Sequence, residues 1–251
     1  MKKITKILLL TFLFSLKISA QVSDFFTPYR TTHLRLPSVP LVVNDPYFSI
    51  WSPYDKLTDG PTAHWTGSPK PLDGLLRVDG TVYRFMGSDY GDVQTAEQES
   101  VSVLATDTYY TFDCGPVELN LVFTAPMLIH DLDLISTPVN YISYQVSSKD
   151  KKSHSVQLYL SASPEIAQNR TDQPTRSHKL DKSGMEVLES GTVDQPILAK
   201  KGDGICIDWG YVYLPAVNGK VSLGTSDEVR SSFVSSGRLP AGEKEIFSYK
   251  S

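Results

Sequence analysis

Short runs in which apolar and polar residues alternate recur along most of the chain, and turn-forming residues separate them. Such alternation is typical of strands, whose successive side chains point to opposite faces of a sheet. The clearest pair is 74–78 and 81–85, which flanks Asp79-Gly80, a dipeptide that favours a two-residue hairpin turn. Further strands are expected at 47–51, 100–105, 109–112, 117–123, 141–146, 156–160, 205–209 and 211–214.

These strands are short and closely spaced, and no window carries a long helical apolar period. Runs 141–146 and 156–160 flank the polar stretch 149–153, so we expect them to be adjacent antiparallel strands. The pattern predicts an all-β fold, an antiparallel β-sandwich that is supersandwich-like, rather than βαβ units.

Other stretches depart from the alternating pattern. Residues 21–73 are rich in Pro and aromatic residues and predict an extended lead-in on the sheets, whereas 164–200 are polar and predict long loops. The Ser-rich stretch 231–236 is expected to be a strand edge or a loop. A last strand pattern begins at Glu243, and the chain stops at Ser251, which suggests a truncated product.

The first twenty residues have the composition of a secretory signal peptide. Three lysines precede an apolar run at 7–16, and Ala20 stands at the expected cleavage point. The run is too short for a stable transmembrane span, so we expect a secreted or periplasmic protein with no membrane span after cleavage. The chain then divides into the signal peptide (1–20), a lead-in domain (21–87) and a β-sandwich domain (88–251) that is truncated at its C-terminus.

Composition and charge narrow the classes of function. Removal of residues 1–20 removes four of the 24 basic residues and leaves a net charge of −8, which argues against a nucleic-acid partner. The chain has two cysteines, Cys114 and Cys206, and an oxidising compartment permits a disulfide between them. Two buried free thiols are the alternative, since Cys114 shares strand parity with Tyr110 and Phe112.

The densest group of chemically able side chains lies between residues 43 and 67. Asp45, Asp59, His64 and Trp65 are the candidate ligand-binding residues, because a carboxylate near a histidine can do acid–base work and a ring can stack on a ligand. Trp51 could add a second ring. The alternative is structural: Asn-Asp-Pro and Asp-Gly-Pro form turns, and the tryptophans would be packed.

Metal and cofactor signals are weak. Residues 130–133, His-Asp-Leu-Asp, offer three polar side chains on alternating faces and are expected to be a surface turn. The chain has no Gly-x-Ser-x-Gly, phosphate-binding Gly-rich loop or His-Glu-x-x-His motif. We therefore predict no cofactor and no metal, and these motifs assign no catalytic residue.

Ordered motifs in the lead-in carry a family resemblance. The sequence resembles the N-terminal part of the secreted glutaminase A-like family over about residues 28–251, more loosely beyond residue 87. The motifs that carry it are 41–52 (with Asn-Asp-Pro-Tyr-Phe-Ser-Ile-Trp), 57–62, His64-Trp65-Thr66-Gly67, 74–80, 83–87 and 231–237.

The resemblance implies the N-terminal, non-catalytic portion of an amidohydrolase that converts L-glutamine to L-glutamate and ammonia. Family members are longer, and their C-terminal helical, toroid-like domain, the expected intramolecular partner, has no counterpart here. The isolated sandwich should then expose an apolar patch and an open strand edge, and associate with itself. Two alternatives remain open: a carbohydrate-binding β-sandwich module, or the N-terminal part of a glycoside hydrolase with a helical toroid catalytic domain. Either a small molecule or a glycan would suit as substrate.

Overall fold

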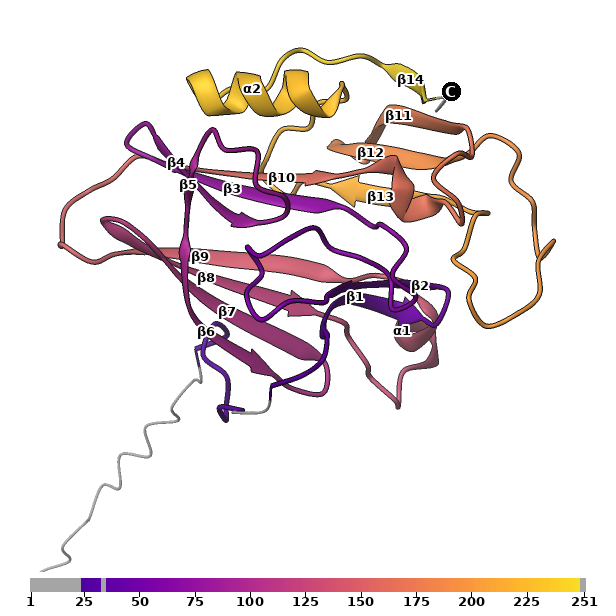
Figure 1. The fold of residues 1–251 in the computed structure, drawn as a ribbon, viewed down its shortest axis with the longest axis horizontal. Helices are drawn as coiled ribbons and strands as arrows, with labels where there is room; N and C mark the ends of the chain where they lie inside the picture. Colours follow the sequence, from indigo (N-terminus) through magenta and orange to yellow (C-terminus); the bar gives the residue numbers. More distant parts are fainter. Residues whose placement is uncertain (1–23, 33–34, 249–251) are drawn as a thin grey trace, which may run out of the picture.

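The central feature of the fold is a sandwich of two four-stranded sheets. In the computed structural model, which describes residues 24–32 and 35–248, these sheets lie face to face (Figure 1). One has the order β6-β7-β8-β9 and the other the order β10-β3-β4-β5. Their strands are β3 (Leu72–Val78), β4 (Thr81–Met86), β5 (Gln94–Thr95), β6 (Glu97–Val103), β7 (Asp107–Cys114), β8 (Val117–Thr124), β9 (Tyr141–Ser148) and β10 (Val156–Ala162).

The remaining elements surround this sandwich. A third four-stranded sheet, β13-β12-β11-β14, lies beside it (Figure 1). The hairpin β1-β2 packs against β7 and β8, the inner strands of the lower sheet, and buries Val39, Leu41 and Ile50 in the core. The all-β sandwich predicted from the sequence is confirmed. These elements are β1 (Val39–Asp45), β2 (Phe48–Ser52), α1 (Leu132–Ser136), η1 (Pro164–Ala167), β11 (Thr175–Lys182), β12 (Met185–Thr192), β13 (Val212–Pro215), α2 (Ser226–Ser236) and β14 (Glu245–Ser248).

Alternating strands build the core between the two sheets. Every second residue of β7 is buried, from Thr108 to Cys114, and Phe112 is completely inaccessible. Its ring lies 5.9 Å from that of Phe85 on β4, which joins the two sheets across the core. Burial of these side chains supplies the main stabilisation of the sandwich.

The predicted hairpin at Asp79-Gly80 is confirmed. β3 and β4 pair antiparallel, and both turn residues have positive φ, 50° at Asp79 and 96° at Gly80. β3 also pairs with β10 along its whole length. Strands on both sides of the predicted domain boundary at residue 87 therefore share one sheet, while that boundary itself stays a prediction.

The prediction that 141–146 and 156–160 pair with each other is wrong. β9 pairs with β8 in one sheet, and β10 pairs with β3 in the other. The polar stretch 149–153 is thus a crossover between the two layers. Alternation identified both strands correctly, but it contains no information about which neighbour each strand has.

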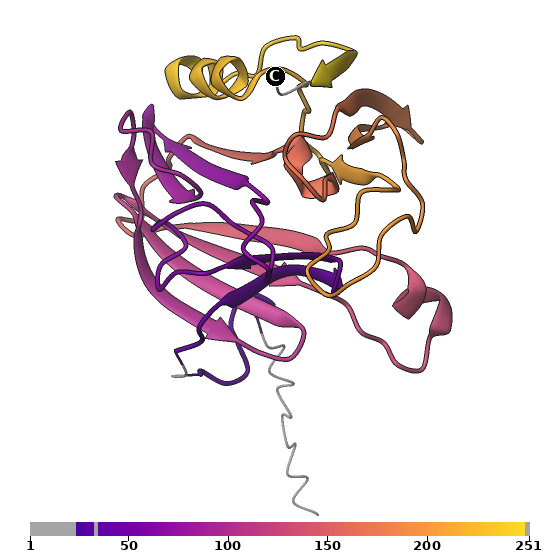
Figure 2. The same cartoon turned by 45° about the vertical axis from the view of Figure 1, so that its right-hand side comes forward.

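Two predicted loop regions are regular structure. Within 164–200, β11 and β12 form an antiparallel hairpin over eight residue pairs, closed by Ser183 and Gly184 with positive φ. The Ser-rich stretch 231–236 belongs to α2, whose Val229 and Phe233 pack on the outer face of β3, β4 and β10. Figures 1 and 2 both show α2 above this sheet. Conversely, the strand predicted at 205–209 is irregular structure.

The two cysteines are free and buried, so the alternative with two thiols is the correct one. Cys114 ends β7 inside the sandwich core, and burial raises the pKa of its thiol to about 12. Cys206 lies elsewhere, where its amide donates to Asn169 Oδ1 at 2.9 Å.

The predicted signal peptide (1–20) and Tyr249, at the end of the last predicted strand pattern, lie outside the described residues. Across the described ranges, no helix has the length and apolar character needed to cross a bilayer.

A histidine connects the β3–β4 turn with the crossover. His154 Nδ1 lies 2.6 Å from Asp79 Oδ2, and its Nε2 lies 2.9 Å from Asp150 Oδ1. The hydrogen bonds to Asp79 and Asp150 raise the pKa of His154, and the hydrogen bond from His154 lowers the pKa of each carboxylate. The imidazolium therefore bridges two carboxylates that are far apart in the sequence.

This bridge predicts a pH window of stability. The contribution of His154 to the free energy of unfolding is complete below the ordinary histidine pKa of 6.5 and is lost as pH rises through its raised pKa. The contribution of Asp79 and Asp150 is present above the ordinary aspartate pKa of 3.8 and is lost as pH falls below that value. We therefore expect the thermal denaturation midpoint to be highest between pH 3.8 and pH 6.5. In His154→Asn this maximum in the plot of midpoint against pH should flatten. The exposed His130→Asn variant is the control, and an unchanged pH profile in His154→Asn would refute the bridge.

Candidate functional site

Two of the predicted site residues converge on one backbone carbonyl. Trp65 Nε1 donates to the carbonyl oxygen of Pro46 at 2.6 Å, and His64 Nε2 lies 3.0 Å from the same oxygen. Pro46 occupies the turn between β1 and β2, and the two rings lie with centroids 5.5 Å apart. The motif around His64 therefore holds the tip of the β1–β2 hairpin.

Asp45 sits at the same turn. Its Oδ1 accepts from the amides of Tyr47 at 2.7 Å and Phe48 at 3.0 Å, which is the hydrogen bonding of an Asx turn. The structure thus brings Asp45, His64 and Trp65 together at this hairpin. The carboxylate of Asp45 is used by the turn itself.

The neighbours of His64 select one tautomer of its neutral ring. The carbonyl of Pro46 can only accept, so Nε2 carries the hydrogen, and Nδ1 is left to accept from Thr66, whose hydroxyl lies at 2.9 Å and whose amide lies at 3.3 Å. Burial, with a smaller effect from Lys70, lowers the pKa of His64, and the residue is only 2% exposed. A neutral imidazole with both nitrogens engaged serves to orient the turn.

The two tryptophans differ in what they offer. Trp65 is 50% exposed, and its indole nitrogen is already bonded, so one part of the ring is open to a ligand. Trp51 lies in β2 and is partly buried, and its Nε1 is buried without a hydrogen-bond partner. Trp65 is therefore the aromatic residue of this group that solvent reaches more freely.

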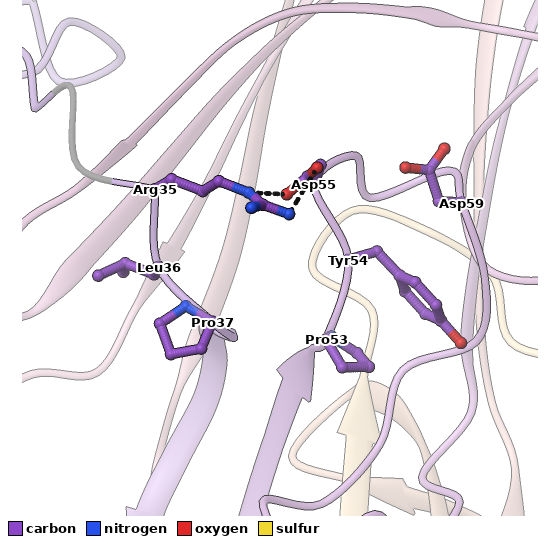
Figure 3. A pocket seen from close by; sticks show the side chains of 7 residues that line it. All are labelled: Arg35, Leu36, Pro37, Pro53, Tyr54, Asp55 and Asp59. Carbon is purple, nitrogen blue, oxygen red and sulfur yellow. Dashed lines mark hydrogen bonds and ion pairs between the residues drawn. The ribbon is translucent and has the colours of Figure 1, made fainter.

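Asp59 lies apart from the hairpin turn, in a second place. It lines an open hollow of about 610 Å³ together with Arg35, Tyr54 and Asp55 (Figure 3). Its Oδ2 accepts from the amide of Lys56 at 3.1 Å, which closes the turn 56–59. The structure therefore separates Asp59 from the other three candidate residues.

An ion pair borders this hollow. Arg35 Nε lies 2.7 Å from Asp55 Oδ1, and a second nitrogen of the guanidinium reaches Oδ2 at 3.1 Å (Figure 3). The hydrogen bond from Arg35 lowers the pKa of Asp55, and the pair is exposed. Twenty residues separate the two side chains, so no local sequence pattern predicts this pair.

The expected surface turn at 130–133 includes the start of a short exposed helix. Asp131 Oδ1 accepts from the amide of Leu134 at 3.0 Å, so Asp131 is the N-cap of α1. Over residues 24–32 and 35–248, no group of three or more His, Cys, Asp and Glu side chains is placed to hold a metal ion.

Two protein-family models match this chain. A family described as a domain of unknown function, DUF5127, matches residues 106–250, which is more than half of the chain. The chain belongs to this family. A second domain of unknown function, DUF4964, matches residues 12–97. The DUF5127 stretch includes β10, which pairs with β3 of the DUF4964 stretch, so one sheet spans both.

A curated relative supports the family resemblance. Glutaminase A of Aspergillus oryzae (strain ATCC 42149 / RIB 40) is 31% identical over 165 residues, which cover 61% of this chain and 23% of that protein. The match therefore spans less than a quarter of the relative. No solved structure matches the chain. A distant relationship to glutaminase A, implied by the motifs of the lead-in, is thus supported in part.

Proposed function

We propose that this chain is the N-terminal, non-catalytic β-sandwich portion of a secreted glutaminase A-like amidohydrolase. The observation that carries the proposal is the 31% identity to glutaminase A, confined to 23% of that protein. The polar atoms of the candidate site agree with a supporting role. Asp45, Asp59 and His64 all bind backbone groups of their own chain. Export follows from the predicted signal peptide at 1–20.

An exposed apolar surface supports the same proposal. The segment between β8 and β9 carries large apolar side chains that are 37–77% exposed, and α1 within it buries none of its residues. Apolar patches of this kind mark interaction sites. We call this the α1 surface; its residues are Met127, Leu128, Ile129, Leu132, Leu134, Ile135 and Val139.

The proposed occupant of the α1 surface is the helical catalytic domain that the resemblance implies. Free of that domain, the apolar side chains remain in water, so two copies of the chain should associate through them. Catalysis of glutamine hydrolysis would then reside in the helical domain, with this sandwich as its support.

The test uses purified residues 21–251. We expect no ammonia release from L-glutamine above background, and concentration-dependent association in sedimentation velocity. Leu132→Ser with Ile129→Ser should shift the distribution to monomer. Val217→Ser with Ile197→Ser, which changes two similarly exposed apolar residues elsewhere, is the matched control.

The two readouts can fail separately. Clear glutamine hydrolysis by this chain would overturn the non-catalytic assignment. A monomer at all concentrations, or an equal effect of both variant pairs, would overturn the α1 surface as a docking site.

A further inference from the structure

At the end of the sheet β13-β12-β11-β14 that contains Thr175, one face is turned inward and the other to solvent, whereas further along the outer face Val187 is only 6% exposed. On the inward face, Thr175 and Ser177 of β11 are 1% and 5% exposed. Side chains of the alternate parity point to the other face. That face carries two rows of aromatic and polar residues, and none of them belongs to the sites described above.

The first row crosses all four strands in register. Tyr213 on β13 is opposite Glu189 on β12, and Glu189 is opposite His178 on β11. His178 is in turn opposite Glu245 on β14. Side chains in directly opposite positions lie within about 5 Å of each other at Cβ, so the four form a continuous line.

The second row runs beside the first. Arg176 on β11 is opposite Gly191 on β12 and opposite Phe247 on β14. The Arg176 guanidinium lies 4.4 Å from the centroid of the Phe247 ring. A Cβ at Gly191 would lie 2.7 Å from Cδ1 of Tyr211, so the glycine lets the Tyr211 ring lie against the sheet. Aromatic rings thus occupy both edges, with polar groups between them.

The polar groups are held in place by one another. Arg176 Nε lies 3.2 Å from Glu245 Oε1, and His178 Nδ1 lies 3.6 Å from the same oxygen. Tyr213 donates a hydrogen bond to Glu189, which raises the pKa of the tyrosine. Mutual pairing fixes these side chains before any ligand arrives, which lowers the entropic cost of binding.

We propose that this face, the Tyr211–Tyr213 face, binds a neutral oligosaccharide. Tyr211, directly before β13, and Tyr213 within it are 51% and 52% exposed. Two residues of extended chain place them about 7 Å apart, where they can stack on the C–H faces of neighbouring sugar rings. The carboxylates of Glu189 and Glu245 accept from sugar hydroxyls, and Arg176 donates to them.

The charges on the face favour a neutral ligand. One arginine and a histidine stand among two glutamates, so the face has no strong field for an anion or a cation. Its exposed rings are mainly tyrosines, which combine an apolar face with a polar tip. An apolar helix would suit the α1 surface better than this face. The proposal is independent of the glutaminase relationship.

Affinity electrophoresis of purified residues 21–251 tests the proposal. Native gels contain barley β-glucan, xyloglucan, glucomannan or glycogen, with alginate as an acidic comparison. We expect at least one neutral polysaccharide to retard the chain. Tyr211→Ala with Tyr213→Ala should weaken that binding about tenfold or more. Glu189→Gln, which keeps the shape of the side chain, should weaken it several-fold.

Matched variants separate this face from other aromatic residues. Tyr141→Ala with Tyr144→Ala removes two tyrosines of the same exposure from β9, and Trp65→Ala removes the ring of the hairpin site. Both should leave retardation unchanged, and thermal denaturation should show every variant folded. The proposal is overturned by no retardation in any neutral gel, by retardation in alginate alone, or by undiminished binding in the Tyr211/Tyr213 variant.

Discussion

Replacing Phe85 by Ala should lower the free energy of unfolding by about 3–5 kcal/mol. Phe85 is completely inaccessible, and its ring contacts both layers of the sandwich through Phe112 and the β3 backbone. Its removal loses buried apolar area and leaves a cavity in the region that joins the sheets. Urea denaturation followed by fluorescence measures the change. Phe25→Ala, at a 52% exposed position, is the control and should have little effect.

Gly74 makes this prediction more specific. A Cβ at Gly74 would lie 2.3 Å from Cε2 of Phe85, so Gly74→Ala in the natural chain should cost about 1–3 kcal/mol by overpacking. In the Phe85→Ala background the same methyl group enters the new cavity, and its cost should fall to near zero. Additive effects of the two substitutions would contradict this packing, because residues in contact are expected to be coupled.

Lys70→Met should cost about 2–4 kcal/mol, since it removes a charged donor from two carbonyl oxygens, those of Glu165 and Gln168, and the amide of Gln168 still donates to the first of them. Lys70 is 3% exposed, and its Nζ donates to the carbonyl oxygens of Glu165, at 2.7 Å, and Gln168. Its amide also bonds the carbonyl of Thr62, at the start of the segment that carries His64 and Trp65. The lysine therefore anchors the candidate hairpin site to η1.

The pH dependence of the free energy of unfolding should show that the Lys70 amine is buried. Burial is the main reason that the pKa of Lys70 lies below its ordinary value of 10.5. The unfolded chain then holds the proton more tightly, so stability should rise as pH increases through the interval below 10.5. Lys70→Met should lack that rise, whereas Lys201→Ala, at an exposed position, should keep it. The same rise in the Met variant would refute the assignment to Lys70.

Local signals in the sequence determined the elements whose structure depends on near neighbours. The β3–β4 hairpin follows from Asp79-Gly80, because a two-residue turn needs positive φ at both positions and fixes the register of its strands. The alternation of β7 likewise separates its buried face from its exposed face. Asp45 forms a turn by bonding its own backbone, as the alternative structural interpretation held.

Helix α2 shows where local pattern was insufficient. The structure caps it at both ends: Thr225 accepts from the amide of Glu228, and Gly237 adopts the left-handed conformation that ends a helix. Its apolar side chains are few, the buried Val229 and Phe233 and the partly buried Val234, among serines with weak helix propensity. The outer face of β3, β4 and β10 supplies the packing that makes this segment helical.

Only the tertiary structure decided which distant residues meet. The alternating pattern of β9 and β10 is the same whether they pair together or in separate sheets, and the layers separate them because each completes a different sheet. The row from Tyr213 to Glu245 exists because four strands from 178 to 245 share one register. Period and turn chemistry act over a few residues, whereas strand partners are chosen by the apolar faces that the whole chain can bury together.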